Sequence, residues 1–285
     1  MNIVYKFLKS VSFLRRFRDP IIDLRDTFFS FSYSKSGISK EHLKKLKGRV
    51  GLEIGGPSWL WRSIIPAYRL SKRIDNFNRA NKTIFGQEHV EGKGQFRYFF
   101  LKTGDQYISD NGFSIFPDSC YDFVLMCEVL EHLANPIKLL VEIRRLIKPG
   151  GLLIVVVPNK QGTFDYARPY TPFSHLLDDF INDVSETDQT HFQEAKDLIH
   201  DHREPSYTTR AELADLVEDN ENTRFLHHHV FSDETIARVC SEAGFRVLGL
   251  SKSVFPEIII IAEKYSDKNL RHKPAVELIR SYSVK

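Results

Sequence analysis

Two carboxylates and an imidazole lie close together in the chain, at Glu128, Glu131 and His132. Carboxylate oxygens are ligands that Mg²⁺ prefers, and a histidine nitrogen widens the choice to Mn²⁺ or a related divalent cation. Without a metal, His132 could act as a general base that takes a proton from an acceptor. The segment therefore indicates either a divalent-cation site at these three residues or a catalytic His132.

More histidines follow in a polar stretch of the chain, including the runs at 200–202 and 227–229. They could complete a metal site, supply a general base, or only cap helices and bond to the backbone. Asp188, His191 and Glu194 are spaced to lie near one face of a helix. We select His191 as a second candidate catalytic residue, because Asp188 could orient its imidazole.

The segment Glu53–Ser58 has the composition of a loop that approaches a nucleotide. A buried strand is expected at 49–54, and Gly55 and Gly56 follow it at once. Glycines allow the backbone to approach a ligand closely, since no side chain stands in the way. Glu53, Gly55 and Gly56 are thus candidate cofactor-binding residues, although a plain turn after a strand can have the same composition.

Two later acids are candidates for the same cofactor site. Asp75 follows a strand-like stretch at 71–74, and an acid at the end of the second strand binds ribose hydroxyls in dinucleotide folds. Asp110 follows another short strand-like stretch, with Asp105 as a competing candidate. The alternative for each acid is a solvated carboxylate in a loop.

The elements that must position these residues are clearest between 121 and 159. Residues 122–126 predict a strand, and Asn135-Pro136 is typical of a helix start. A turn at 148–151 then leads into a continuous apolar run at 152–157, which is typical of a buried parallel strand. Strand, helix and strand form a βαβ crossover.

The block YDFVLMCEVLEHLANPIKLLVEIRRLIKPGGLLIVVVPN (Tyr121–Asn159) resembles class I S-adenosylmethionine-dependent methyltransferases of the type 11-like group. Glu53–Ser58 resembles their first motif, with Pro57 in place of the usual second glycine. The resemblance implies an α/β, Rossmann-like fold with a seven-stranded, mostly parallel sheet and an antiparallel last strand. It also implies that S-adenosyl-L-methionine binds at the C-terminal ends of the strands.

The resemblance bears on single residues as well. Asp110 resembles the acid that ends the third strand near the adenine. The pattern E-x-x-E-H at 128–132 is similar to the metal site of ubiquinone-pathway O-methyltransferases and of small-RNA 2′-O-methyltransferases. The EIGGPS loop and the His/Asp-rich stretch are similar to uncharacterised bacterial members, which are associated with sugars or cell-surface glycans.

These patterns predict a core that is interrupted by an insertion. The expected parts are an N-terminal helical lid (1–47), a cofactor-binding core (48–159), a mostly helical cap insertion (160–229), a core helix with a C-terminal β hairpin (230–265) and a basic tail (266–285). The basic, amphipathic start of the chain could alternatively lie on an anionic membrane surface.

Composition narrows the classes of function. The 285 residues are 42% hydrophobic and 27% charged, with a net charge of +3, which is too small to indicate nucleic acid as an obligatory partner. The three cysteines form no C-x-x-C pair, and no apolar run is long enough for a membrane helix, so a cytoplasmic protein is expected.

The combined prediction is a methyltransferase that moves a methyl group from S-adenosyl-L-methionine to a hydroxyl of a small polar molecule, such as a sugar or glycan. One alternative is a methyltransferase-like binding or scaffold protein without chemistry. Another is a nicotinamide-dependent oxidoreductase or epimerase, which needs a G-x-G-x-x-G loop that Pro57 interrupts.

Overall fold

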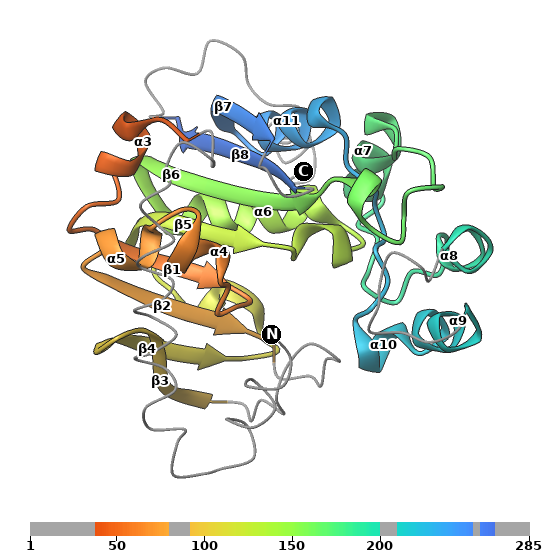
Figure 1. Ribbon diagram of the computed structural model, residues 1–285, viewed down its shortest axis with the longest axis horizontal. Coiled ribbons are helices and arrows are strands. Elements are labelled where there is room, and N and C mark those ends of the chain that lie inside the picture. The colour runs from red at the N-terminus through yellow and green to blue at the C-terminus, as the bar shows by residue number, and fades with distance from the viewer. Residues whose placement is uncertain (1–37, 80–91, 200–209, 253–256, 266–285) are drawn as a thin grey trace, which may run out of the picture.

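The computed structural model describes residues 38–79, 92–199, 210–252 and 257–265. Within these residues one eight-stranded sheet has the order β3-β4-β2-β1-β5-β6-β8-β7 (Figure 1). The strands are β1 (Val50–Ile54), β2 (Arg73–Asn78), β3 (Gly92–Phe99), β4 (Lys102–Ile108), β5 (Tyr121–Cys127), β6 (Ile147–Pro158), β7 (Phe245–Lys252) and β8 (Glu257–Lys264). The five central strands from β4 to β6 pair in parallel.

This sheet confirms the expected Rossmann-like α/β fold and adds one edge strand to it. β8 is antiparallel to both β6 and β7, as the predicted hairpin requires. The extra strand, β3, pairs antiparallel with β4. Its first four residues, beginning with Gly92, are exposed, so β3 lacks the apolar alternation from which a strand is recognised.

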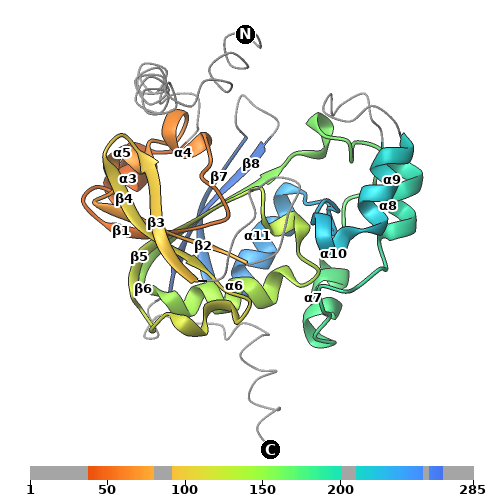
Figure 2. The same cartoon turned by 90° about the horizontal axis from the view of Figure 1, so that it is seen from below.

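Helices cover both faces of the sheet (Figures 1 and 2). They are α3 (Lys40–Lys44), α4 (Leu60–Ser63), α5 (Ala67–Leu70), α6 (Pro136–Leu146), α7 (Phe173–Ile181), α8 (Phe192–Leu198), α9 (Arg210–Glu218), α10 (Asn220–Thr223) and α11 (Asp233–Glu242), with 3₁₀ helices η3 (Gly112–Ile115), η4 (Leu130–His132) and η5 (Lys160–Gly162). Alternate residues of β6 face opposite sides: Leu153 and Val155 pack with α6 and α11, whereas Leu152 and Ile154 pack with α3 to α5.

The stretch between β6 and α11 contains α7 to α10. Figure 1 shows α8, α9 and α10 beyond the end of the sheet to which the arrowheads of β1 and β2 point. α8 and α9 have a small core of their own, which includes Ala195, Leu213 and Phe225. The parallel strands thus end towards this helical segment, where ligands bind in open α/β sheets.

Several predictions fall near or beyond the described ranges. Most of the expected N-terminal lid and the whole basic tail lie outside the described residues. Within the predicted lid, the described part contains only the short helix α3, which has Ser39 as its N-cap and Lys44 as its last residue. None of the described helices has the length and apolarity needed to cross a membrane.

Candidate functional site

The loop after β1 lies tightly against the sheet. Gly55 and Gly56 both have φ of +76°, a conformation that side chains other than glycine rarely adopt. The Gly55 amide donates to the carbonyl of Phe77 at 3.0 Å, which ties the loop to β2. A Cβ atom on Gly56 would lie 2.1 Å from Oε1 of Glu53, so the loop has room only for glycine there.

Glu53, the residue before Ile54 at the end of β1, supports this loop through hydrogen bonds. Its buried carboxylate accepts a hydrogen bond from the Tyr68 hydroxyl at 2.7 Å and another from the Ser58 amide at 3.1 Å. Burial raises the pKa of Glu53 to about 8, although these two hydrogen bonds oppose the rise. Glu53 therefore positions the loop, while Gly55, Gly56 and Ser58 form its exposed surface.

A cavity of about 720 Å³ opens beside the loop. Its walls combine Gly55 and Gly56 with Phe77 and Phe113, and with Glu128 and His132 from the connection after β5. The helical segment contributes Ser185, Glu186 and Arg224. The volume is that of a typical cofactor or substrate site, and the lining mixes apolar side chains with polar and charged ones.

The prediction that Asp75 ends the second strand is wrong. β2 continues to Asn78, and Asp75 is buried within the strand. Its carboxylate pairs with Arg73 at 2.6 Å and accepts from the Asp105 amide and the Tyr121 hydroxyl. Asn78 lines the cavity at the position that had been expected for Asp75.

Asp110 lies where the sequence predicts an acid, just after β4. It is exposed and precedes η3, whose Gly112 and Phe113 line the cavity. The competing acid, Asp105, lies within β4 and pairs with Arg73 at 2.8 Å. Asp110 itself is not among the residues that line the cavity, and Asp105 is bound within the sheet.

The three residues of the predicted cation site separate after β5. Glu128 has a positive φ of 51° and lines the cavity. Glu131 lies in η4 and is 1% exposed, and among the described residues neither of its carboxylate oxygens has a hydrogen-bond partner. Glu131 and His132 come together with His227 rather than with Glu128, and the ligand atoms of these three lie within 4.8 Å of one another.

In both His132 and His227, Nδ1 contacts a residue outside this group of three. Nδ1 of His132 lies 3.1 Å from the carbonyl oxygen of Leu226, and Nδ1 of His227 lies 2.5 Å from Oδ2 of Asp165. Nε2 of His132 is 4.0 Å from Oε1 of Glu131. A carboxylate that orients a histidine through one nitrogen while the other faces a site is typical of metal ligation.

The charges at this group are set mainly by burial. Burial raises the pKa of Glu131 to about 8 and lowers that of His132 to about 3. Burial also lowers the pKa of His227, but the Asp165 carboxylate opposes it and the net shift is upward. His132 is therefore neutral at neutral pH, which is the form that binds a metal.

His191 lies in a different group from the one just described. Its Nε2 is 2.9 Å from Nε2 of His175, and it is not part of the cavity wall. Asp188 does not orient it, because that carboxylate bonds to Thr190. The predicted common helical face is also wrong, since α8 begins after His191 and Glu194 pairs with Arg168.

The sequence did not predict that His227 joins Glu131 and His132, or that Asp165 bonds to His227. Arg168 is 1% exposed and binds Asp165, Glu194 and the carbonyl of His227. The signal was the pair of opposite charges at Asp165 and Arg168 beside an apolar strand, because a charge without a partner is rarely buried. Nothing in the sequence tied this pair to the distant histidine run.

The chain was compared with known proteins. A family model described as a methyltransferase domain matches residues 66–250. A tRNA U34 carboxymethyltransferase of Hydrogenovibrio crunogenus is 31% identical over 126 residues, 42% of this chain and 36% of that protein. A ubiquinone biosynthesis O-methyltransferase of Maricaulis maris is 52% identical over 40 residues, 14% of this chain and 16% of that one.

Solved structures are more distant in sequence. An S-adenosylmethionine-dependent methyltransferase from Mesorhizobium loti is 11% identical, with a TM-score of 0.43 over 77% of this chain and 93% of that chain. Human N-acetylserotonin methyltransferase in complex with SAM is 13% identical, with a TM-score of 0.42 over 93% of this chain and 60% of that chain. The two curated relatives are thus matched over little more than a third of their own length, or less.

Proposed function

Because the chain belongs to the methyltransferase domain family, we propose that it transfers a methyl group from S-adenosyl-L-methionine to a hydroxyl of a small polar acceptor, such as a sugar or cell-surface glycan. The observation that carries this proposal is the single cavity wall shared by Gly55, Gly56, Glu128 and His132. A cofactor held by the glycine loop would present its methyl group toward the connection after β5.

The cofactor would bind mainly to backbone. Gly55 and Gly56 have no side chain that could cover the loop. Glu53 holds the loop by accepting a hydrogen bond from the Ser58 amide. Asn78 takes the place intended for Asp75, and its side-chain amide is a polar partner for ribose hydroxyls. Asp110 stays a candidate for the adenine end, because it lies two residues before Gly112, which lines the cavity.

The acceptor would enter from the helical segment. Ser185, Glu186 and Arg224 line the cavity, and Nη1 of Arg224 lies 3.4 Å from Oε2 of Glu186. Lys138 adds a cation to the same wall. A site built to bond hydroxyl groups needs such paired donors and acceptors, and it rejects analogues that lack those groups.

Glu131, His132 and His227 are proposed to hold a divalent cation. Their fit rests on the two unpartnered oxygens of the buried Glu131 and on two imidazoles that are each anchored through Nδ1. Of these three residues His132 lines the cavity, so a cation beside it would lower the pKa of an acceptor hydroxyl that reached this wall. A histidine whose pKa is about 3 is a poor general base near neutral pH, so we assign His132 to ligation rather than to proton removal.

Methyl transfer itself needs alignment more than covalent help from the protein. The direct displacement breaks the bond between sulfur and the methyl carbon and forms one to the acceptor oxygen. Glu128, which has a positive φ and lines the cavity together with the glycine loop, is the residue we propose to orient the acceptor hydroxyl against the methyl group. The proton of that hydroxyl leaves to a base that belongs to the solvent or to the acceptor side of the cavity.

Calorimetry on the full chain with S-adenosyl-L-methionine and, separately, with NAD tests the cofactor. Binding of the first without the second is expected, and tight binding of NAD alone would overturn the proposal. Incubation with methyl-labelled cofactor and a panel of free sugars, nucleosides and quinols then tests the acceptor class. Label that reaches only nitrogen or carbon atoms would contradict transfer to a hydroxyl.

A further inference from the structure

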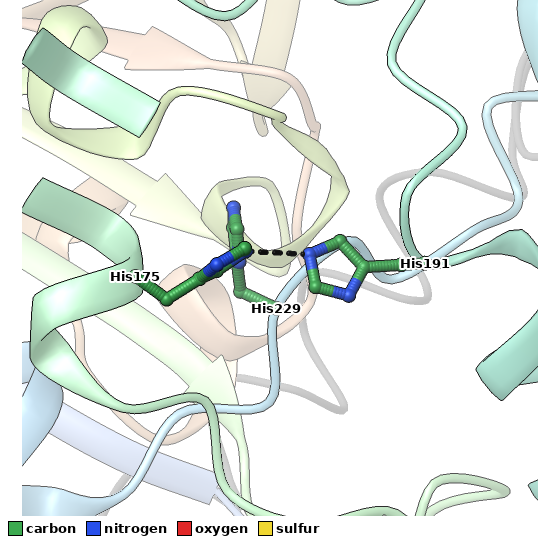
Figure 3. A group of neighbouring side chains, drawn as sticks. All are labelled: His175, His191 and His229. Atoms are coloured by element: carbon green, nitrogen blue, oxygen red, sulfur yellow. Dashed lines mark hydrogen bonds between the residues drawn. The ribbon is translucent and has the colours of Figure 1, made fainter. Parts of the chain in front are cut away.

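Three histidines from separate parts of the helical segment meet outside the cavity. His175 lies on α7, His191 directly precedes α8, and His229 follows α10. Figure 3 shows the rings of His175 and His191 pointing at one another, with His229 beside them. Their ligand atoms lie within 4.8 Å of one another.

A carboxylate completes the group. Oδ2 of Asp179, one turn after His175 on α7, lies 3.4 Å from Nε2 of His175 and 3.7 Å from Nε2 of His229. Two nitrogen ligands of a tetrahedral Zn²⁺, each about 2.0–2.1 Å from the ion, lie about 3.3 Å apart. The distances from Nε2 of His175 to Nε2 of His191 (2.9 Å) and to Oδ2 of Asp179 (3.4 Å) are close to that spacing.

Two of the polar atoms have no partner. Within the described part of the chain, Nδ1 of His229 and Oδ2 of Asp179 are buried without a hydrogen bond. His229 is 1% exposed, and its Nε2 is bonded to the carbonyl of Ala134, so Nδ1 keeps a lone pair. Buried polar atoms without partners are rare unless an ion or water completes them.

We propose that His175, His191, His229 and Asp179 form a second metal site, of the zinc type, that ties together three separate parts of the helical segment. Three imidazoles and one carboxylate suit Zn²⁺, Co²⁺ or Ni²⁺ better than Mg²⁺. His229 is already joined, through the Ala134 carbonyl, to the connection between η4 and α6. The site does not depend on the proposed methyl transfer, because none of its ligands lines the cavity.

Metal content tests this site without any measurement of activity. The full chain is stripped with EDTA, titrated with Zn²⁺ and with Co²⁺, and followed by mass-spectrometric metal analysis and by the visible bands of tetrahedral Co²⁺. We expect one tightly held ion that survives Glu131→Gln and His227→Asn. His191→Asn and Asp179→Asn should each weaken binding by about tenfold or more.

Matched variants separate loss of the site from loss of the fold. His42→Asn removes a histidine of α3, far from the group in the chain, and should leave metal binding unchanged. Zn²⁺ in large excess should raise the melting temperature of the wild type by about 5 °C, and that of His191→Asn much less. A wild-type chain that binds neither Zn²⁺ nor Co²⁺ would overturn the proposal. So would binding that is as tight after His191→Asn and after Asp179→Asn as in the wild type.

Discussion

Asp165 and His227 share a hydrogen bond of 2.5 Å between Oδ2 and Nδ1, although they are 62 residues apart. The same Asp165 carboxylate pairs with Arg168 through its other oxygen at 2.8 Å. Burial raises the pKa of Asp165, but His227 and Arg168 outweigh it and the net shift is downward. Asp165 therefore holds His227 through Nδ1, which leaves Nε2 as the nitrogen that can bind another group.

Asp165→Asn should lower the affinity for Mg²⁺ or Mn²⁺ at the first group by about 10–100-fold, because the ring of His227 loses its orienting carboxylate. Titration of the cation dependence of methyl transfer measures the effect. Glu194→Gln is the matched control, since it also removes a partner of Arg168 but leaves His227 bonded. Equal losses in the two variants would show that Arg168, not His227, matters.

Gly56→Ala should weaken S-adenosyl-L-methionine binding by more than about tenfold, because the new Cβ would collide with Glu53 and displace the loop. Gly150→Ala is the control, because it introduces the same backbone strain without a collision. Gly150 has a similar φ of +74°, and nothing lies within 4 Å of a Cβ built there. It should lose about 1 kcal/mol of stability and keep its cofactor affinity.

Above about pH 6.5, where the buried histidines of lowered pKa are neutral in both the folded and the unfolded state, stability should fall as the pH rises to about 8. Glu53 and Glu131 both have a pKa near 8 in the folded state against about 4.5 otherwise, so the folded state binds more protons across this window. The loss is on the order of a few kcal/mol for each group. Glu131→Gln should flatten the dependence of the melting temperature on pH, and a profile unchanged in this variant would refute the assignment.

The raised pKa of Glu131 also predicts how the stabilising effect of a bound cation depends on pH. A cation at Glu131 requires the ionised carboxylate, so Mn²⁺ should raise the melting temperature more at pH 8 than at pH 6. In Glu131→Gln this difference between the two pH values should disappear. A shift of the same size at both pH values in the wild type would argue against ligation by Glu131.

Asp75→Asn should destabilise the fold by about 1–3 kcal/mol and leave cofactor affinity nearly unchanged, because its carboxylate binds Arg73 and the Asp105 amide inside the sheet. Asn78→Ala should weaken cofactor binding and leave the stability of the fold nearly unchanged. Chemical denaturation and calorimetry measure the two quantities. A cofactor affinity that fell in Asp75→Asn and not in Asn78→Ala would restore the role predicted for Asp75.

The sequence predicted the sheet well where neighbouring residues determine it. The βαβ unit from Tyr121 to Asn159 depends on local periodicity, an Asn-Pro helix start and a glycine turn, and its strands and helix form as expected. The residues of the predicted turn at 148–151 belong to β6, whose pairing with β5 shifts register there. Asp75 was misplaced because strand ends carry little local signal, and β2 runs three residues further to Asn78.

The side-chain groups were predicted only in part. Glu131 and His132 are neighbours in the chain, so their spacing alone indicated a shared site. His227 joins them from the far end of the helical segment, and that contact depends on how α7 to α10 pack, which no local pattern encodes. His191 was selected for a neighbour, Asp188, that bonds to Thr190 instead.

The run His227–His228–His229 supplies one imidazole to each of the two groups. The Cα atoms of His227 and His229 can be at most about 7.6 Å apart, because each trans peptide spans about 3.8 Å. Both side chains are buried, so charges placed in the two groups would repel one another with little screening. The first ion to bind would therefore weaken the second, and the two sites would fill with negative cooperativity.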